Sequence, residues 1–395
     1  MASMRAFGVA AVLGAGALAG YAWSRQGATH AEAGEPSGKP AERFHLGTHS
    51  RPVTTKVSDA QKAFDRGLVL AYAFSHNAAE AEFRAAAKAD PECAMAWWGV
   101  ALVNGPHINF PIVLPEKAKV AWDALGKARA LAPKAGETER ALIAALATRY
   151  ADPQPENRAG LDEAYAAAMR RLAKKHPKDA DVQALCAEAL MDLHPWDLWT
   201  AVGEPQPWTG EILETLERSM AADARHPLAN HLWIHAVESS PKPERGLPQA
   251  DVLRDLVPGA GHLVHMPAHV YARVGRWADA AAANVRGIEA DAFYRTTRVD
   301  PGFYYVYMAH NHHFLAFTAM MRGRSAEALT SARTMVAGIP AAFLESFAAV
   351  ADGFVIFPSA VLMRFGKWEE ILAEPKPRDG LPLSRRCGAS RGPSR

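Results

Sequence analysis

The sequence has few cysteines, no large excess of charge and none of the common loops that bind phosphate or present a nucleophile. Three cysteines among 395 residues are too few, and odd in number, for a secreted domain held together by disulfides. The formal net charge is +2 at pH 7, and no basic stripe is interleaved with aromatic residues, so nucleic acid is not an expected partner. Phosphate loops, dinucleotide fingerprints and nucleophile elbows are absent. The sequence therefore favours no particular class of reaction.

Residues 1–33 have the composition of a targeting segment. Arg5 precedes an apolar run rich in glycine and alanine, from Phe7 to Trp23, and the small-residue stretch Ala31-Glu32-Ala33 follows. This order is typical of a secretory signal with an A-x-A cleavage site, or of an uncleaved signal anchor. A cleaved signal is favoured because the run is at the lower length limit for spanning a bilayer. The protein is expected to be periplasmic or secreted, with any membrane contact confined to an anchor at the N-terminus.

The rest of the chain predicts an all-α domain between two irregular segments. Residues 34–57 are interpreted as a linker because they are rich in proline, glycine and polar residues. Over residues 58–378 alanine is abundant and apolar residues recur at spacings of three and four, without the alternation typical of strands. Residues 379–395 lose this periodicity and are expected to form an irregular, basic tail.

Small residues and turn glycines recur along this domain at regular offsets. Counted from Gly67, the chain places small or aromatic residues where two helices of a repeat would cross, and a proline where the repeat would end. Similar turns follow at Gly275, Gly323 and Gly366. The pattern resembles the tetratricopeptide repeat superfamily over most of residues 58–375. That resemblance implies a right-handed superhelix with a concave groove lined by the first helix of each repeat. The residues that carry the first repeat are Ala79, Phe83, Ala86 and Pro91.

Histidines recur with the period of such a repeat. His231 and His235 are each followed 34 residues later by another histidine, His265 and His269. A spacing of four places both members of a pair on one face of a helix. In the register that the resemblance implies, seven histidines and one glutamate face the groove, and the histidine-rich stretch resembles a bacterial subset of the superfamily that has no established activity. These residues are His231, His235, Glu238, His262, His265, His269, His310 and His313.

This histidine set predicts a transition-metal site, because neutral imidazole is the commonest protein ligand for such ions. Zinc or copper is expected ahead of iron or nickel, and Glu238 is a candidate ligand or general base. Seven imidazoles exceed the needs of one ion, so two ions, or one ion beside histidines that bind a substrate, are both open. Pro267 leaves open whether His262 and His265 share a helix with His269. The alternative function is a scaffold that binds a small molecule, a peptide or a partner protein in the groove.

One segment interrupts the helical pattern. Residues 195–208 contain three tryptophans and three prolines. We expect them to form a long ordered loop over the groove or along the edge of the array.

Overall fold

The computed structural model describes residues 45–297, 299–374 and 381, so the predicted signal or anchor and nearly all of the predicted tail lie outside the described residues. Within the described ranges the regular structure is helical, with only two isolated bridges, His107 to Phe110 and Trp199 to Pro205. None of the described helices combines the length and the apolar character that a membrane span requires. The predicted all-α fold of tetratricopeptide type is confirmed by the helix pairs and turns below.

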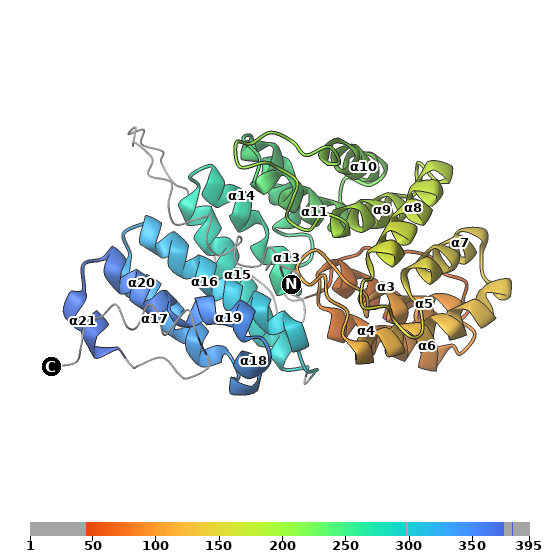
Figure 1. Cartoon of the computed structure of the whole chain (residues 1–395), viewed down its shortest axis with the longest axis horizontal. Helices are drawn as coiled ribbons and strands as arrows, with labels where there is room; N and C mark the ends of the chain where they lie inside the picture. Colours follow the sequence, from red (N-terminus) through yellow and green to blue (C-terminus); the bar gives the residue numbers. More distant parts are fainter. Residues whose placement is uncertain (1–44, 298, 375–380, 382–395) are drawn as a thin grey trace, which may run out of the picture.

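The chain forms a curved succession of helices (Figure 1). The N-terminal group at the right of the figure contains α3 (Ser58–Tyr72), α4 (His76–Ala89), α5 (Ala94–Leu102), α6 (Pro115–Leu131) and α7 (Glu137–Leu146). The middle group contains α8 (Ala159–Lys175), α9 (Ala180–Asp192), α10 (Thr209–Ala222), α11 (Pro227–Glu238) and α12 (Leu247–Leu253). The next group contains α13 (Gly261–His265), α14 (Pro267–Arg273), α15 (Trp277–Arg295), α16 (Tyr305–Met321) and α17 (Ser325–Gly338). The last described helices are α18 (Ala341–Ser346), α19 (Ala348–Val355), α20 (Phe357–Arg364) and α21 (Trp368–Ala373).

Glycine determines both the turns and the closest helix crossings. Gly275, Gly323 and Gly366 each follow a helix with positive φ, at 80°, 72° and 68°. After Gly275, the amide of Arg276 donates a 2.8 Å hydrogen bond to the carbonyl of Tyr271, and the two other turns repeat this geometry. Such bonds satisfy carbonyls that a helix C-terminus would leave free, and a side chain at the glycine would be strained. The three turns predicted from the sequence are therefore helix-ending glycine turns.

The first crossing is built around one aromatic ring. A Cβ atom added to Gly67 or Gly99 would lie 2.8 Å or 2.5 Å from a ring carbon of Phe83. The Phe83 side chain is fully buried, so the absence of a side chain at both glycines lets α3, α4 and α5 pack closely. This is the steric reason for the small residues that the repeat pattern requires.

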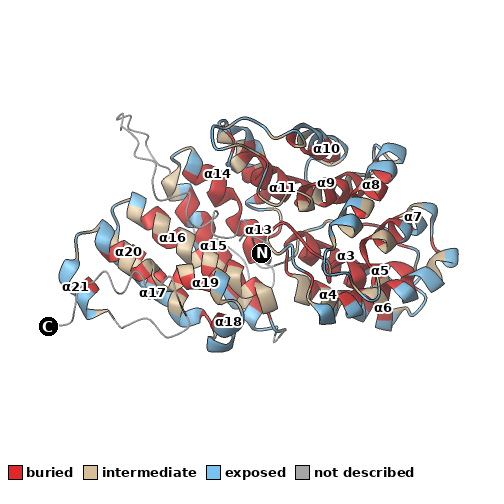
Figure 2. Ribbon diagram, in the orientation of Figure 1, coloured by how far each residue is buried: buried red, intermediate tan, exposed pale blue. Residues whose placement is uncertain are grey.

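The array bends back on itself, so its inner surface is covered. Helix α3 packs against α11 as well as against its sequence neighbours, and one hydrophobic core joins Tyr72 and Phe74 to Tyr307 of α16. A polar contact also joins the N-terminal helices to α16, because the Asn109 side chain donates a 3.0 Å hydrogen bond to the Tyr307 hydroxyl. Figure 2 shows α11, α13 and α14 mostly in red, because nearly all of their residues are buried. The surface expected to line an open groove is thus enclosed by the N-terminal helices.

Candidate metal centre

Helix α11 positions the first three residues of the predicted site. The helix begins at Pro227, and the Nδ1 atom of His226 caps it by accepting a hydrogen bond from the Ala229 amide at 3.2 Å. His231 and His235 are 0% and 5% exposed, one turn apart on the inner face. Glu238 follows at the last helical residue. The helix therefore directs two imidazoles and one carboxylate inward.

The proline between His265 and His269 does not divert the second set of histidines. Met266, which separates α13 from α14, keeps helical dihedral angles of φ −50° and ψ −38°. Its amide still donates to the His262 carbonyl at 3.0 Å, and its carbonyl accepts from the His269 amide at 3.1 Å. Pro267 removes one backbone donor but leaves the course of the helix intact. His262, His265 and His269 therefore face the same side, although Pro267 lies between them.

Helix α16 brings His310 to this surface but directs His313 to another neighbour. The Nε2 atom of His310 lies 3.4 Å from Nε2 of His269. The His313 ring packs edge-on against Phe357, with ring centroids 4.2 Å apart, and its Nδ1 atom is buried without a hydrogen-bond partner. Six of the seven predicted histidines therefore converge, and His313 lies beside them.

The six imidazoles form two groups, which we call the first and second triads and together the histidine centre. In each triad one nitrogen from every ring lies within 4.8 Å of the other two. The triads adjoin one another, because the ring centroids of His262 and His265 are 6.1 Å apart, as are those of His235 and His269. The first triad contains His231, His235 and His262, and the second contains His265, His269 and His310.

Hydrogen bonds to Nδ1 fix the orientation of four of these rings. Both oxygens of Glu238 are used in this way: Oε1 accepts from Nδ1 of His235 at 2.8 Å, and Oε2 accepts from Nδ1 of His269 at 2.5 Å. The remaining acceptors are the Tyr72 carbonyl, 2.8 Å from Nδ1 of His231, and Asn284 Oδ1, 2.7 Å from Nδ1 of His265. Since these acceptors require a proton on Nδ1, a neutral ring presents a free electron pair at Nε2.

The Nε2 atoms of the rings then face one another. Nε2 of His265 lies 2.8 Å from Nε2 of His269, and Nε2 of His231 lies 3.1 Å from Nε2 of His262. Nε2 of His235 is buried without any hydrogen-bond partner. Nδ1 of His262 has no hydrogen-bond partner, so its Nε2 atom can carry the proton and donate to His231. His265 and His269 both carry their proton on Nδ1, so their two Nε2 electron pairs repel and the contact requires a positive charge between them, either a proton or a metal ion. Three nitrogens converging on one point match the ligand number of a metal site.

Burial sets the protonation of the centre. It lowers the pKa of His231, His262 and His265 well below the ordinary value, and neighbouring imidazoles add to the effect for each of them. Burial alone would raise the pKa of Glu238, but the adjacent His269 and His235 outweigh it and hold that pKa below its usual range. Burial thus favours the neutral, metal-binding form of these three rings, beside one ionised carboxylate.

A further histidine cluster was not predicted. Asp181 Oδ1 accepts hydrogen bonds from Nε2 of His49 and of His226, both at 3.0 Å, and from the Tyr72 hydroxyl at 2.6 Å, while Oδ2 accepts from Arg51. The carboxylate is fully used by donors, so this cluster is a hydrogen-bonded support rather than a ligand set. His49 and Arg51 fall in the segment interpreted as a linker, and no local pattern signals a contact with a residue 132 positions away.

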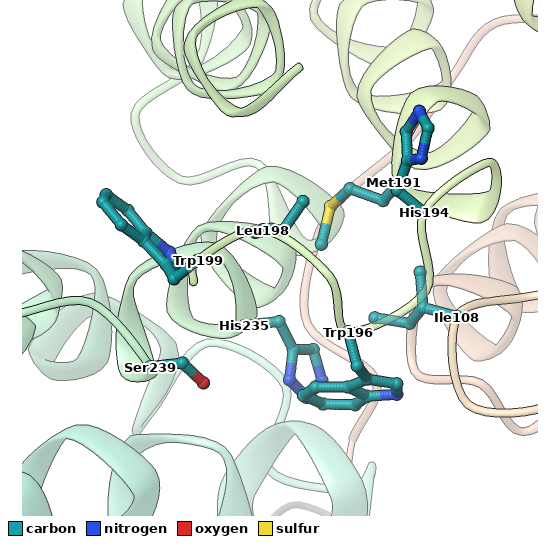
Figure 3. A pocket seen from close by; sticks show the side chains of 8 residues that line it. All are labelled: Ile108, Met191, His194, Trp196, Leu198, Trp199, His235 and Ser239. Atoms are coloured by element: carbon teal, nitrogen blue, oxygen red, sulfur yellow. The ribbon is translucent and has the colours of Figure 1, made fainter. Parts of the chain in front are cut away.

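The tryptophan-rich segment covers one side of the histidine centre. The Trp196 ring meets the His235 ring edge-on with centroids 5.0 Å apart, and Trp199 Nε1 donates a 2.7 Å hydrogen bond to the Ala236 carbonyl of α11. A pocket opens between them, and Figure 3 shows its lining. The segment predicted to lie over the groove or at the edge of the array therefore lies against the site. The lining residues are Ile108, Met191, His194, Trp196, Leu198, Trp199, His235 and Ser239.

Comparisons with known proteins add little to this description. No protein-family model matches the sequence, and no curated protein matches it. Among solved structures, the chain is similar to the crystal structure of the P58(IPK) TPR domain, with 12% identity over 85% of this chain and 98% of that one, at a TM-score of 0.22. A likeness at this score carries no argument about function. The repeat fold rests on the helix pairs and glycine turns described above.

Proposed function

We propose that this protein binds a transition metal at the histidine centre. The observation that carries the proposal is the set of four imidazoles whose Nδ1 atoms are committed to acceptors, so that their Nε2 atoms converge. Protein metal sites commonly use this arrangement, in which a carbonyl or carboxylate holds the far side of each ligand ring. The ion supplies the positive charge that the close nitrogen pair of His265 and His269 requires.

In this proposal Glu238 is a positioning residue. From the sequence it was a candidate ligand or general base, but each of its oxygens accepts an imidazole N–H. A carboxylate used in this way orients the rings and increases their basicity. The pocket that His235 lines makes a metalloenzyme one form of the proposal, with hydrolysis and oxidation equally open.

A protein partner is the second candidate function. Helical-repeat arrays of this kind are generally interaction modules, which supports a partner that docks on the array. The histidine surface is a poor candidate for peptide binding, because His231 and His265 are fully buried. We also propose export from the cytoplasm, for which the composition of residues 1–33 is the support.

The test is metal analysis of the purified, untagged protein. We expect a stoichiometric transition metal, a lower melting temperature in chelator, and loss of metal in His235→Ala and His269→Ala. His312→Ala is the matched control, because His312 lies on α16 but its Nδ1 faces Ser331 at 3.4 Å, away from the triads. Circular dichroism checks that each variant folds. The proposal would be refuted if the protein were free of metal and if chelator did not change its stability, even after incubation with zinc, copper, iron or nickel.

A further inference from the structure

We propose that the histidine centre holds two copper(I) ions, one in each triad. This inference rests on the proposed function and goes beyond it in the number and the class of ions. It follows from the grouping of the ligands, from the absence of a free carboxylate among them, and from the charge that a buried site tolerates.

The grouping of the nitrogens argues for two ions. A metal ion bound to imidazole lies about 2.0–2.1 Å from each nitrogen and takes three or four ligands in the common geometries. Each triad supplies three nitrogens within 4.8 Å of one another, so each can close around its own ion with small side-chain movements. A single ion in the first triad would leave the 2.8 Å contact between Nε2 of His265 and Nε2 of His269 without an ion. A single ion in the second triad would leave Nε2 of His235 without a partner.

The donor set argues against hard ions. All six converging donors are imidazole nitrogens, and Glu238 is the one carboxylate that contacts these rings among the described residues. Both of its oxygens face Nδ1 atoms, on the far side of the rings from the converging nitrogens. Paired iron or manganese ions in helical proteins are held largely by carboxylates, and magnesium and calcium require oxygen ligands. Imidazole ligands suit copper, zinc, iron and nickel, and copper(I) is the monovalent ion of this set.

The charge balance favours copper(I) over zinc. Two zinc ions would place four positive charges beside the single negative charge of Glu238, in a centre where His231, His262 and His265 are at most 2% exposed. Two copper(I) ions would bring half that charge. Because uncompensated charge is costly to bury, the monovalent pair leaves the smaller penalty.

The pocket beside the histidine centre is lined by residues whose side chains can bind copper(I). Met191 and His194 line the same pocket as His235 and Trp196 (Figure 3). Thioether sulfur is a soft ligand of the kind that copper(I) prefers, and imidazole also binds copper. Met191 therefore lines the same pocket as His235, the residue whose Nε2 atom lacks a hydrogen-bond partner.

The experiment is an anaerobic titration of the metal-free full-length protein with copper(I) in the presence of a chromogenic copper(I) chelator, and a parallel titration with zinc(II). We expect two copper(I) ions per wild-type chain. His262→Ala, in the first triad, and His310→Ala, in the second, should each retain one tightly bound ion. His312→Ala, on the same helix as His310 but bonded to Ser331, should retain two.

The outcomes separate this inference from the proposed function. A single ion per wild-type chain, of any metal, leaves metal binding intact and overturns the two-ion inference. Two zinc ions without tight copper(I) binding overturn the choice of metal. A chain that binds neither ion overturns both proposals. The wild-type stoichiometry decides these outcomes even if a histidine variant fails to fold, which circular dichroism would detect.

Discussion

Replacing Glu238 by glutamine should disable one triad while leaving the other intact. The carboxylate accepts a hydrogen bond from each of two imidazoles, at 2.8 Å from His235 and 2.5 Å from His269. Glutamine offers one oxygen and one NH₂ group, so one of the two rings would meet a donor instead of an acceptor. That ring relieves the conflict by moving its proton from Nδ1 to Nε2. Its Nε2 atom is then no longer a ligand.

The size of the effect follows from the role of such outer carboxylates. Changing the partner of a ligand histidine typically weakens metal binding by about 10- to 100-fold, or about 1.4 to 2.8 kcal/mol. We expect a loss of this size for one ion and near wild-type affinity for the other. The metal-free variant should also be less stable by about 1.5 to 3 kcal/mol, the contribution of one hydrogen bond to a charged group.

The assay is a competition titration that resolves two binding steps, together with urea unfolding of the metal-free protein. Glu214→Gln on α10, an exposed position, is the control for a glutamate-to-glutamine change without a structural role. The reasoning would be refuted if Glu238→Gln bound two ions with wild-type affinities, because both rings would then be oriented without the carboxylate.

Three further predictions concern packing, pH and access. Gly99→Ala should destabilise the protein by about 1 to 3 kcal/mol in urea unfolding, because its Cβ atom would lie 2.5 Å from the buried ring of Phe83. The control Gly126→Ala should be neutral or stabilising, because its Cβ atom would meet nothing within 4 Å. Equal effects of the two substitutions would contradict the crossing geometry. Burial raises the pKa of Asp291 to about 7, so the native state binds the extra proton, and the contribution of Asp291 to the free energy of unfolding should fall by on the order of a few kcal/mol as pH rises from about 4 to about 7. Asp291→Asn should lack that slope, and parallel stability curves would count against it. Trp196→Ala should speed copper exchange with a chelator while leaving the stoichiometry unchanged, and an unaltered exchange rate would exclude Trp196 as a barrier beside His235.

The repeat turns and the histidine faces were accessible from the sequence because they depend on local spacing. Gly275, Gly323 and Gly366 signal helix ends through the conformation that glycine alone adopts readily. The four-residue spacing of His231 and His235 survives folding because both lie in one helix. These features need no knowledge of distant contacts.

The enclosure of the site could not be predicted, because it depends on contacts between residues far apart in the chain. Nδ1 of His231 bonds to the carbonyl of Tyr72, 159 residues away, and this contact exists only because α3 returns to α11. The two triads themselves also depend on the precise rotation of each ring. Spacing alone indicated a single surface, and it did not distinguish His310 from His313.

Pro267 shows that a helix boundary need not displace the residues before it. The proline allowed a helix start or a kink, and α14 does begin at Pro267. The backbone at Met266 nevertheless stays helical, since losing one amide donor does not by itself change the dihedral angles. Small residues such as Gly261 and Gly287, whose backbones approach closely, hold this segment against α15.

The most direct test of the account is an anomalous difference map from crystals of the copper-loaded protein, with data collected on both sides of the copper absorption edge. The account predicts two separate peaks, one among His231, His235 and His262 and one among His265, His269 and His310. A map from fully loaded crystals with no anomalous peak at either triad would contradict it.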